Sequence, residues 1–336
     1  MSISSDDLEL MEQIGVGSSG VVYKARYLNV LVAVKQCLIC DLLEDPLKEY
    51  MKETQIMSTI RHPNIVQFIA ASIKPPFFYI VTEYCSRGSL DKLLKTSYSG
   101  RLQKSSFKSG LTLKKKCKLL LDAANGLNYL KSKNIIHSDV KVSNCLVTND
   151  WTLKISDFGI ARLFNNKQKK HTKCGTVEIT APEILAEGHY SFKADIYSFG
   201  ICIYELIFEK ELYPGLNIYD ITHKVIHEEM RPKIPTQTEL REMFFGEHFR
   251  IEYNVVNNLI IKLITKCWSA DMNARPEWEE ICETLKQSLA QLSLSTNSGS
   301  FSRLISNPLV SSPVGKSRAL QTFPKKKNVA FESDEE

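Results

Sequence analysis

The sequence predicts an α+β fold in which a small β-rich part precedes a larger helical part. Residues 8–84 alternate apolar and polar side chains as strands do, with one helical interruption. From residue 89 onward, apolar residues recur three and four positions apart, which is the spacing of amphipathic helices. We therefore expect two lobes, of about residues 8–84 and 88–292, with a ligand-binding cleft between them.

The β-rich part contains runs of β-branched and aromatic residues that favour strands. Such runs occupy Val21–Tyr23, Val30–Val34 and Phe77–Thr82. The helical interruption at Pro46–Ile60 has apolar residues three and four apart, and the Asp45–Pro46 pair suits a helix start.

The helical part is predicted to contain long helices, two loops and a tail. Helices are expected at Leu113–Lys131, Phe192–Phe208, Tyr253–Trp268 and Glu277–Leu292. Loops are expected at Thr96–Gly110 and Thr236–Glu252, because both stretches are polar. Residues 293–336 are rich in serine and bury too little apolar surface to offset their chain entropy, which predicts a disordered tail.

The composition is typical of a soluble protein of a reducing compartment. Of the 336 residues, 43% are hydrophobic and 24% charged, and no apolar run is long enough to span a bilayer. Nine scattered cysteines argue against a disulfide framework, so we expect a cytoplasmic location, with the nucleus as the alternative. The net charge of +5 gives no reason to expect nucleic-acid binding, and the oligomeric state stays open.

Gly15, Gly17 and Gly20 form a GxGxxG pattern, which is a weak signal by itself. In a dinucleotide-binding fold this pattern leads from a strand into a helix, whereas β-forming residues follow it here. A hairpin whose glycines let the backbone close over phosphates fits better. A plain glycine-rich hairpin is the alternative.

The segment His137–Asn144 combines the groups that phosphoryl transfer to a hydroxyl requires. Asp139 supplies a carboxylate that orients the hydroxyl, and Lys141 supplies a cation near the migrating charge. Asn144 supplies an oxygen ligand for Mg²⁺. Asp157, in an Asp-Phe-Gly triplet, adds a second candidate metal ligand.

Together, these motifs resemble those of the eukaryotic protein kinases, from Leu8 to about Leu292. The resemblance implies a bilobal kinase fold that uses ATP and Mg²⁺ to phosphorylate a protein substrate. It makes Asp139 the carboxylate that orients the substrate hydroxyl and accepts its proton, and it places Lys141 beside the γ-phosphate. It assigns Asn144 and Asp157 to Mg²⁺.

Lys35 ends a predicted strand and matches the kinase lysine that grips the α- and β-phosphates. Such a lysine needs a carboxylate partner from the helix that follows. Glu53 is the better candidate, because it stands nine residues before the kinase-like stretch His62–Val66. Glu49, one helical turn earlier, is the alternative.

The resemblance also implies a nucleotide pocket. Thr82 matches the gatekeeper position, and Glu83–Cys85 matches the hinge whose backbone would bind adenine. The residues expected to contact the nucleotide are Ile14, Gly15, Gly17, Gly20, Val22, Ala33, Lys35, Thr82, Glu83, Cys85 and Leu146.

Other matches concern architecture. Glu183, which ends a stretch like a kinase activation segment at Gly175–Glu183, is expected to form a buried ion pair with Arg275. Asp195 is expected to brace the backbone of the catalytic loop. The stacked apolar spine of the family is expected at Met57, Phe68, His137 and Phe158.

Lys141 and Thr176 favour serine and threonine as the phosphorylated residues. The elements Cys267–Trp268, Arg275–Pro276 and Arg231–Pro235 resemble the tyrosine-kinase-like group, which includes Raf-like and mixed-lineage-like enzymes.

The alternatives to a protein serine/threonine kinase are a dual-specificity kinase, a small-molecule kinase and a pseudokinase scaffold. A scaffold has no chemical need for the full set Lys35, Glu53, Asp139, Asn144 and Asp157.

Ser138 departs from the family pattern, which usually has an arginine that binds a phosphorylated activation segment. Serine lacks that charge, so we hypothesise that phosphorylation of Thr172 or Thr176 is not the main activating switch. Ile179–Thr180 also replaces the aromatic–methionine pair common before Ala-Pro-Glu, which predicts an unusual peptide preference.

Overall fold

The computed structural model describes residues 3–17, 20–38, 44–74, 77–95, 109–158, 162–163, 176–244 and 249–305. The chain divides into two units, residues 1–296 and residues 297–336. The first unit contains the sheet, the core and all the candidate site residues. Of the second unit, only the end of the last helix is described.

The β-rich part is one antiparallel five-stranded sheet of order β1-β2-β3-β5-β4. Successive side chains of a strand point to opposite faces, so the alternation of the sequence places every second side chain on one face of this sheet. The elements are β1 (Leu8–Gly17), β2 (Gly20–Tyr27), β3 (Val30–Leu38), α1 (Glu44–Thr59), β4 (Phe68–Lys74) and β5 (Phe77–Glu83).

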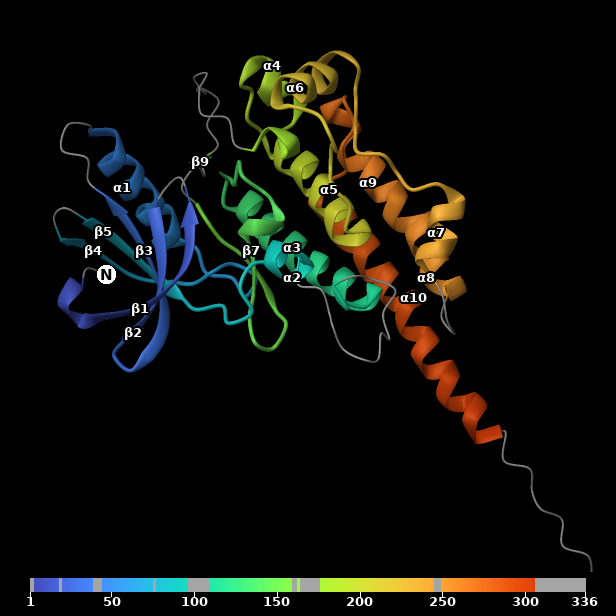
Figure 1. The fold of residues 1–336 in the computed structure, drawn as a ribbon, viewed down its shortest axis with the longest axis horizontal. Helices are drawn as coiled ribbons and strands as arrows, with labels where there is room; N and C mark the ends of the chain where they lie inside the picture. Colours follow the sequence, from blue (N-terminus) through green and yellow to red (C-terminus); the bar gives the residue numbers. More distant parts are fainter. Residues whose placement is uncertain are drawn as a thin grey trace, which may run out of the picture. The chain divides into compact units, whose positions relative to one another are not determined.

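The helical part is built around α5 (Phe192–Phe208), which packs against α3 (Leu113–Ser132) and α9 (Ile261–Cys267) (Figure 1). Nearly every residue of α5 is buried, as expected of a helix that is apolar all round. The other helices are α2 (Leu90–Lys95), α4 (Pro182–Glu187), α6 (Ile218–His227), α7 (Gln237–Met243), α8 (Phe249–Val255) and α10 (Trp278–Ile305).

Short elements complete this part. The strand pairs are β6 (Ile135–Ile136) with β9 (Arg162–Leu163), and β7 (Cys145–Val147) with β8 (Leu153–Ile155). A π-helical turn, Val256–Ile260, joins α8 to α9. The 3₁₀ turns are Ser5–Asp7, Val142–Asn144, Val177–Ile179 and Met272–Ala274.

Backbone hydrogen bonds join the two parts beside the hinge. Ile155 on β8 donates its N–H to the carbonyl of Asn64 and accepts from the N–H of Val66, both at 2.9 Å. The Asn64 side chain donates to the carbonyl of Leu153 at 3.0 Å. The segment between α1 and β4 is therefore bonded directly to the strand that leads to Asp157.

The predicted two-part α+β architecture is confirmed, and the helices predicted at Leu113–Lys131 and Phe192–Phe208 are present within one residue. The helix predicted at Tyr253–Trp268 is divided among α8, a π-helical turn and α9. The loop prediction for Thr236–Glu252 was wrong, because it contains α7 and the start of α8. A capping box at Thr236 and Glu239 begins α7, so local hydrogen bonds offset the polar composition.

The last helix continues past the predicted domain boundary at Leu292 and ends at Ile305. Ser293 takes part in this continuation, because its hydroxyl donates to the carbonyl of Leu289 at 2.7 Å. The rest of the predicted tail, residues 306–336, lies outside the described residues. Within the described part, no helix has both the length and the apolar character needed to cross a bilayer.

Candidate active site

The glycine motif lies in the β1–β2 hairpin, where Gly17 pairs with Gly20 and Gly15 with Val22. This confirms the hairpin and excludes the strand-to-helix turn of a dinucleotide-binding fold. Gly20 has φ +139°, and a Cβ added there would lie 2.3 Å from the Gln36 carbonyl oxygen. Only glycine fits at this position, because a side chain would collide with backbone.

One face of the sheet collects the side chains expected to contact a nucleotide. Strand pairing sets Val22 opposite Lys35 and Ala33 opposite Thr82. Ala33 and Lys35 are two residues apart on β3, so all four side chains point to the same face. All four residues are partly exposed, as are Ile14 on β1 and Leu146 on β7.

Lys35 is held between two carboxylates. Its Nζ lies 2.9 Å from Oε1 of Glu53 on α1 and 3.3 Å from Oδ1 of Asp157. Burial by itself would lower the pKa of Lys35, but the attraction of Glu53 and Asp157 outweighs burial and raises this pKa. The expected Lys35–Glu53 pair is therefore present, and the side chain of Glu49 lies outside the described ones.

The catalytic loop brings Asp139, Lys141 and Asn144 into contact. Oδ2 of Asp139 lies 2.7 Å from Nζ of Lys141 and accepts from Nδ2 of Asn144 at 2.9 Å. Lys141 also donates to the hydroxyl of Thr176 at 3.3 Å. Oδ1 of Asp139 is buried and has no hydrogen-bond partner among the described residues.

A chain of hydrogen bonds sets the position of Asp157. His137 accepts the N–H of Asp139 at Nδ1, so its proton is on Nε2, which donates to the carbonyl of Ser156 at 3.0 Å. The N–H and hydroxyl of Ser156 both donate to the carbonyl of Asn144 at 2.9 Å. The predicted metal ligands Asn144 and Asp157 are thus tied together through Ser156.

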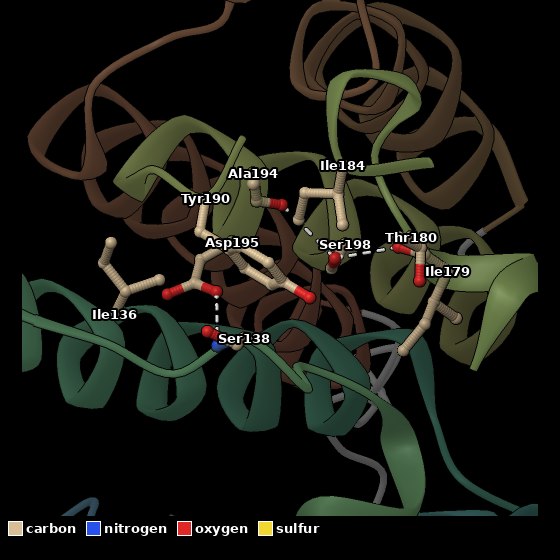
Figure 2. A pocket seen from close by; sticks show the side chains of 9 residues that line it. All are labelled: Ile136, Ser138, Ile179, Thr180, Ile184, Tyr190, Ala194, Asp195 and Ser198. Atoms are coloured by element: carbon tan, nitrogen blue, oxygen red, sulfur yellow. Dashed lines mark hydrogen bonds between the residues drawn. The ribbon is translucent and has the colours of Figure 1, made fainter. Parts of the chain in front are cut away.

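Asp195, near the start of α5, braces the catalytic loop as expected. Its Oδ2 accepts the N–H of His137 at 2.8 Å. Its Oδ1 accepts the N–H of Ser138 at 2.9 Å, the bond drawn in Figure 2. Burial raises the pKa of Asp195, and His137 and the two N–H donors oppose that rise. The bracing bonds hold Ser138 at φ +69°, a conformation that L-residues rarely adopt.

The hinge shows one contact that sequence reasoning missed. The carboxylate of Glu83 faces away from the predicted adenine site, since its Oε1 accepts the N–H of Gln67 at 2.7 Å and pairs with Nζ of Lys154 at 2.9 Å. Glu83 therefore has only backbone to offer a nucleotide. The N–H of Cys85 has no hydrogen-bond partner in the described part of the chain, which suits a hinge donor.

The expected structural pair Glu183–Arg275 is present and bidentate, with distances of 2.6 and 2.8 Å. Arg275 is fully buried and also donates to the carbonyls of Ser269 and Lys193.

The four residues of the predicted spine are buried, and His137 packs against Phe158 with ring centroids 5.3 Å apart.

Several predicted positions lie outside the described residues. They are Gly159 of the Asp-Phe-Gly triplet and, in the segment before Thr176, Thr172 and Gly175.

Comparison of the sequence with known proteins agrees with the geometry of the site. Residues 8–285 match the profile of the family described as protein tyrosine and serine/threonine kinase. Protein R826 of Acanthamoeba polyphaga mimivirus is 35% identical over 294 residues, which cover 87% of this chain and 16% of that protein.

Two relatives from Arabidopsis thaliana are each 34% identical to the chain. The probable serine/threonine-protein kinase SIS8 matches 84% of this chain with 25% of its own length. The serine/threonine-protein kinase CTR1 matches 85% of this chain with 32% of its own length. The chain thus spans a third or less of the length of each of these three relatives. By the family profile and these identities, the chain belongs to the protein tyrosine and serine/threonine kinase family.

Proposed function

We propose that the chain is an ATP- and Mg²⁺-dependent protein serine/threonine kinase of the tyrosine-kinase-like group. The observation that carries this proposal is the different hydrogen bonding of the two oxygens of the Asp139 carboxylate. One oxygen is held by Lys141 and Asn144, whereas the other is buried and makes no hydrogen bond within the described part of the chain. This second oxygen keeps the capacity to accept a hydrogen bond from a substrate hydroxyl, orient it, and take its proton during transfer.

The donors near this carboxylate fit a hard divalent cation. Asn144 turns its amide nitrogen toward Asp139, which leaves its carbonyl oxygen as a ligand, and Asp157 supplies a carboxylate. Two oxygen ligands, with phosphate oxygens and water completing the shell, suit Mg²⁺ better than zinc. A bound Mg²⁺ would neutralise charge on the phosphates.

The β-rich part fits the phosphates of ATP. The glycine-rich hairpin of β1 and β2 would close over the phosphates, and Lys35 is kept charged by Glu53 and Asp157. Lys35 would bind phosphate oxygens while Glu53 holds its ammonium in place. The partly exposed side chains of Ile14, Val22, Ala33 and Leu146 would contact the adenine and ribose.

The preference for serine and threonine rests on the Lys141–Thr176 contact and on the names of the Arabidopsis relatives. The assignment to the tyrosine-kinase-like group rests on its characteristic elements. These elements are in contact, because Arg231 donates to the carbonyl of Trp268 at 2.8 Å. Both guanidinium groups, of Arg231 and Arg275, lie over the ring of Tyr197.

We also propose a protein substrate and a cytoplasmic location. The substrate follows from the family. The location is supported by the cysteines, since buried thiols such as Cys117, Cys145 and Cys202 have a pKa raised by burial and are not in disulfides.

The proposal is tested with the purified chain, labelled ATP, Mg²⁺ and a generic basic-protein substrate. We expect the wild-type protein to label the substrate on serine and threonine, as acid hydrolysis and phosphoamino-acid analysis report. Asp157→Ala and the addition of a chelator should each abolish labelling. Equal labelling by wild type and Asp157→Ala would refute the enzyme proposal, and label on tyrosine would show dual specificity.

A further inference from the structure

A small cavity lies beside the catalytic loop, under the segment that precedes Glu183 (Figure 2). Its walls come from β6, Ser138 of the catalytic loop, side chains between Ile179 and Tyr190, and the first half of α5. The space open to the centre of a water molecule is about 10 Å³, roughly the minimum that one water needs. The cavity is therefore large enough for one water and too small for an organic ligand.

One polar atom on the wall lacks a partner. The Ser138 hydroxyl is buried and makes no hydrogen bond within the described part of the chain. Its backbone N–H is bonded to Asp195, which fixes the residue at φ +69°. A buried hydroxyl without a partner is unfavourable, and native structures usually satisfy such groups with protein or ordered water.

The other polar groups on the wall keep acceptor capacity. Each oxygen of the Asp195 carboxylate accepts one N–H and has a further lone pair. Ser198 donates its hydroxyl to the carbonyl of Ile179 at 2.8 Å, and Thr180 donates to the carbonyl of Thr176 at 2.8 Å. Both hydroxyl oxygens can still accept, and the Tyr190 phenol also lies on the wall, so a water here has donors as well as several acceptors around it.

We propose that this cavity holds one buried water molecule. It accepts the hydrogen of the Ser138 hydroxyl and donates to the Asp195 carboxylate and to a hydroxyl of Thr180 or Ser198. The water connects the catalytic loop to the segment ending at Glu183. The small Thr180 leaves the space that the methionine common in the family would occupy. The site does not depend on the proposed kinase activity.

Stability measurements distinguish a wet cavity from a dry one through a double-mutant cycle on Ser138 and Thr180. Ser138→Ala removes only the hydroxyl, and Thr180→Met fills the cavity. If water is present, Ser138→Ala should increase the unfolding equilibrium constant about tenfold in the wild-type background. In the Thr180→Met background, where the water is expelled, the same change should be neutral or stabilising.

The cycle has its own controls. Thr180→Val removes the hydroxyl without filling the cavity, so the effect of Ser138→Ala should persist in that background. If Thr180→Met does not fold, Thr180→Leu replaces it as the filling variant. A Ser138→Ala effect that is neutral or stabilising in the wild-type background would overturn the proposal, as would an equal loss in both backgrounds.

A crystal structure that resolves ordered water gives the direct test. We expect a density peak within hydrogen-bond distance of the Ser138 hydroxyl and of at least one acceptor on the opposite wall. This peak should be absent in Thr180→Met. Empty density in the wild-type cavity would show that the site is dry.

Discussion

Lys154, on β8, forms an ion pair with Glu83 at the end of β5, with 2.9 Å between Nζ and Oε1. Both side chains are largely buried, and the same carboxylate oxygen accepts the N–H of Gln67. The pair thus joins the helical part to the hinge at the point where adenine is expected to bind.

Lys154→Met should weaken ATP binding without harming phosphoryl transfer. Loss of the ammonium leaves the Glu83 carboxylate with fewer partners, so the hinge backbone is less ordered before ATP binds. We expect the KM for ATP to rise about fivefold with kcat nearly unchanged. Lys210→Met, which breaks the exposed Lys210–Glu239 pair, should change neither constant. A fall in kcat with an unchanged KM for ATP would contradict this role.

Glu53→Gln should damage catalysis far more than Glu49→Gln. The Glu53 carboxylate holds the Lys35 ammonium at 2.9 Å, and without its charge Lys35 shifts toward Asp157. We expect kcat/KM to fall about 100-fold, the usual effect of misplacing a catalytic group by an ångström. Steady-state kinetics of both variants provide the check. A larger fall in kcat/KM for Glu49→Gln than for Glu53→Gln would show that Glu53 is not the functional partner of Lys35.

Arg275→Met should destabilise the fold by about 3–5 kcal/mol, because it leaves the Glu183 carboxylate buried and unpaired. Lys266→Met is the matched control, since its pair with Glu280 is half exposed and should contribute about 0–1 kcal/mol. Urea unfolding followed by fluorescence measures both. A similar decrease in the free energy of unfolding for the two variants would mean that the burial of an ion pair does not determine how much its loss destabilises the fold.

Glu205 should make stability fall as the pH rises toward neutrality. Burial, with repulsion from Asp91, raises the pKa of Glu205 to about 7 from an ordinary 4.5. Between these values the folded chain keeps a proton that the unfolded chain releases. Unfolding is therefore favoured by up to about 3 kcal/mol as pH rises through this window. Glu205→Gln should remove this part of the pH slope and be more stable than wild type above pH 7.

The measurement is the free energy of unfolding at several pH values, with the exposed Glu211→Gln as the control. An unchanged slope in Glu205→Gln would mean that Glu205 does not titrate in this range.

Thr172→Ala should keep most of the kinase activity, because Ser138 offers no charge to a phosphorylated activation segment. The check is the initial rate of substrate phosphorylation beside wild type. Near-complete loss of activity would show that another group replaces the missing arginine.

Local spacing in the sequence was enough to predict the catalytic loop. Asp139, Lys141 and Asn144 lie within six residues of one another, so a single loop conformation brings them together. Strand alternation likewise explains why Lys35 and Ala33, two residues apart on β3, share a face of the sheet. Such features depend on the period of the backbone, which the order of residues displays directly.

The helix α7 was missed although its signal is local. Thr236 and Glu239 form a capping box, but the polar composition of the stretch favoured a loop. The capping hydrogen bonds, rather than apolar periodicity, begin this helix.

The sequence by itself determined the two-part fold, the hairpin at the glycines and the set of charged groups in the catalytic loop. Only the tertiary structure decided that Lys154 reaches Glu83 and that Ser138 has a hydroxyl facing a cavity. Both depend on side chains from distant segments that meet when the core packs. Burial and partner choice are properties of that packing, and no periodicity in the chain encodes them.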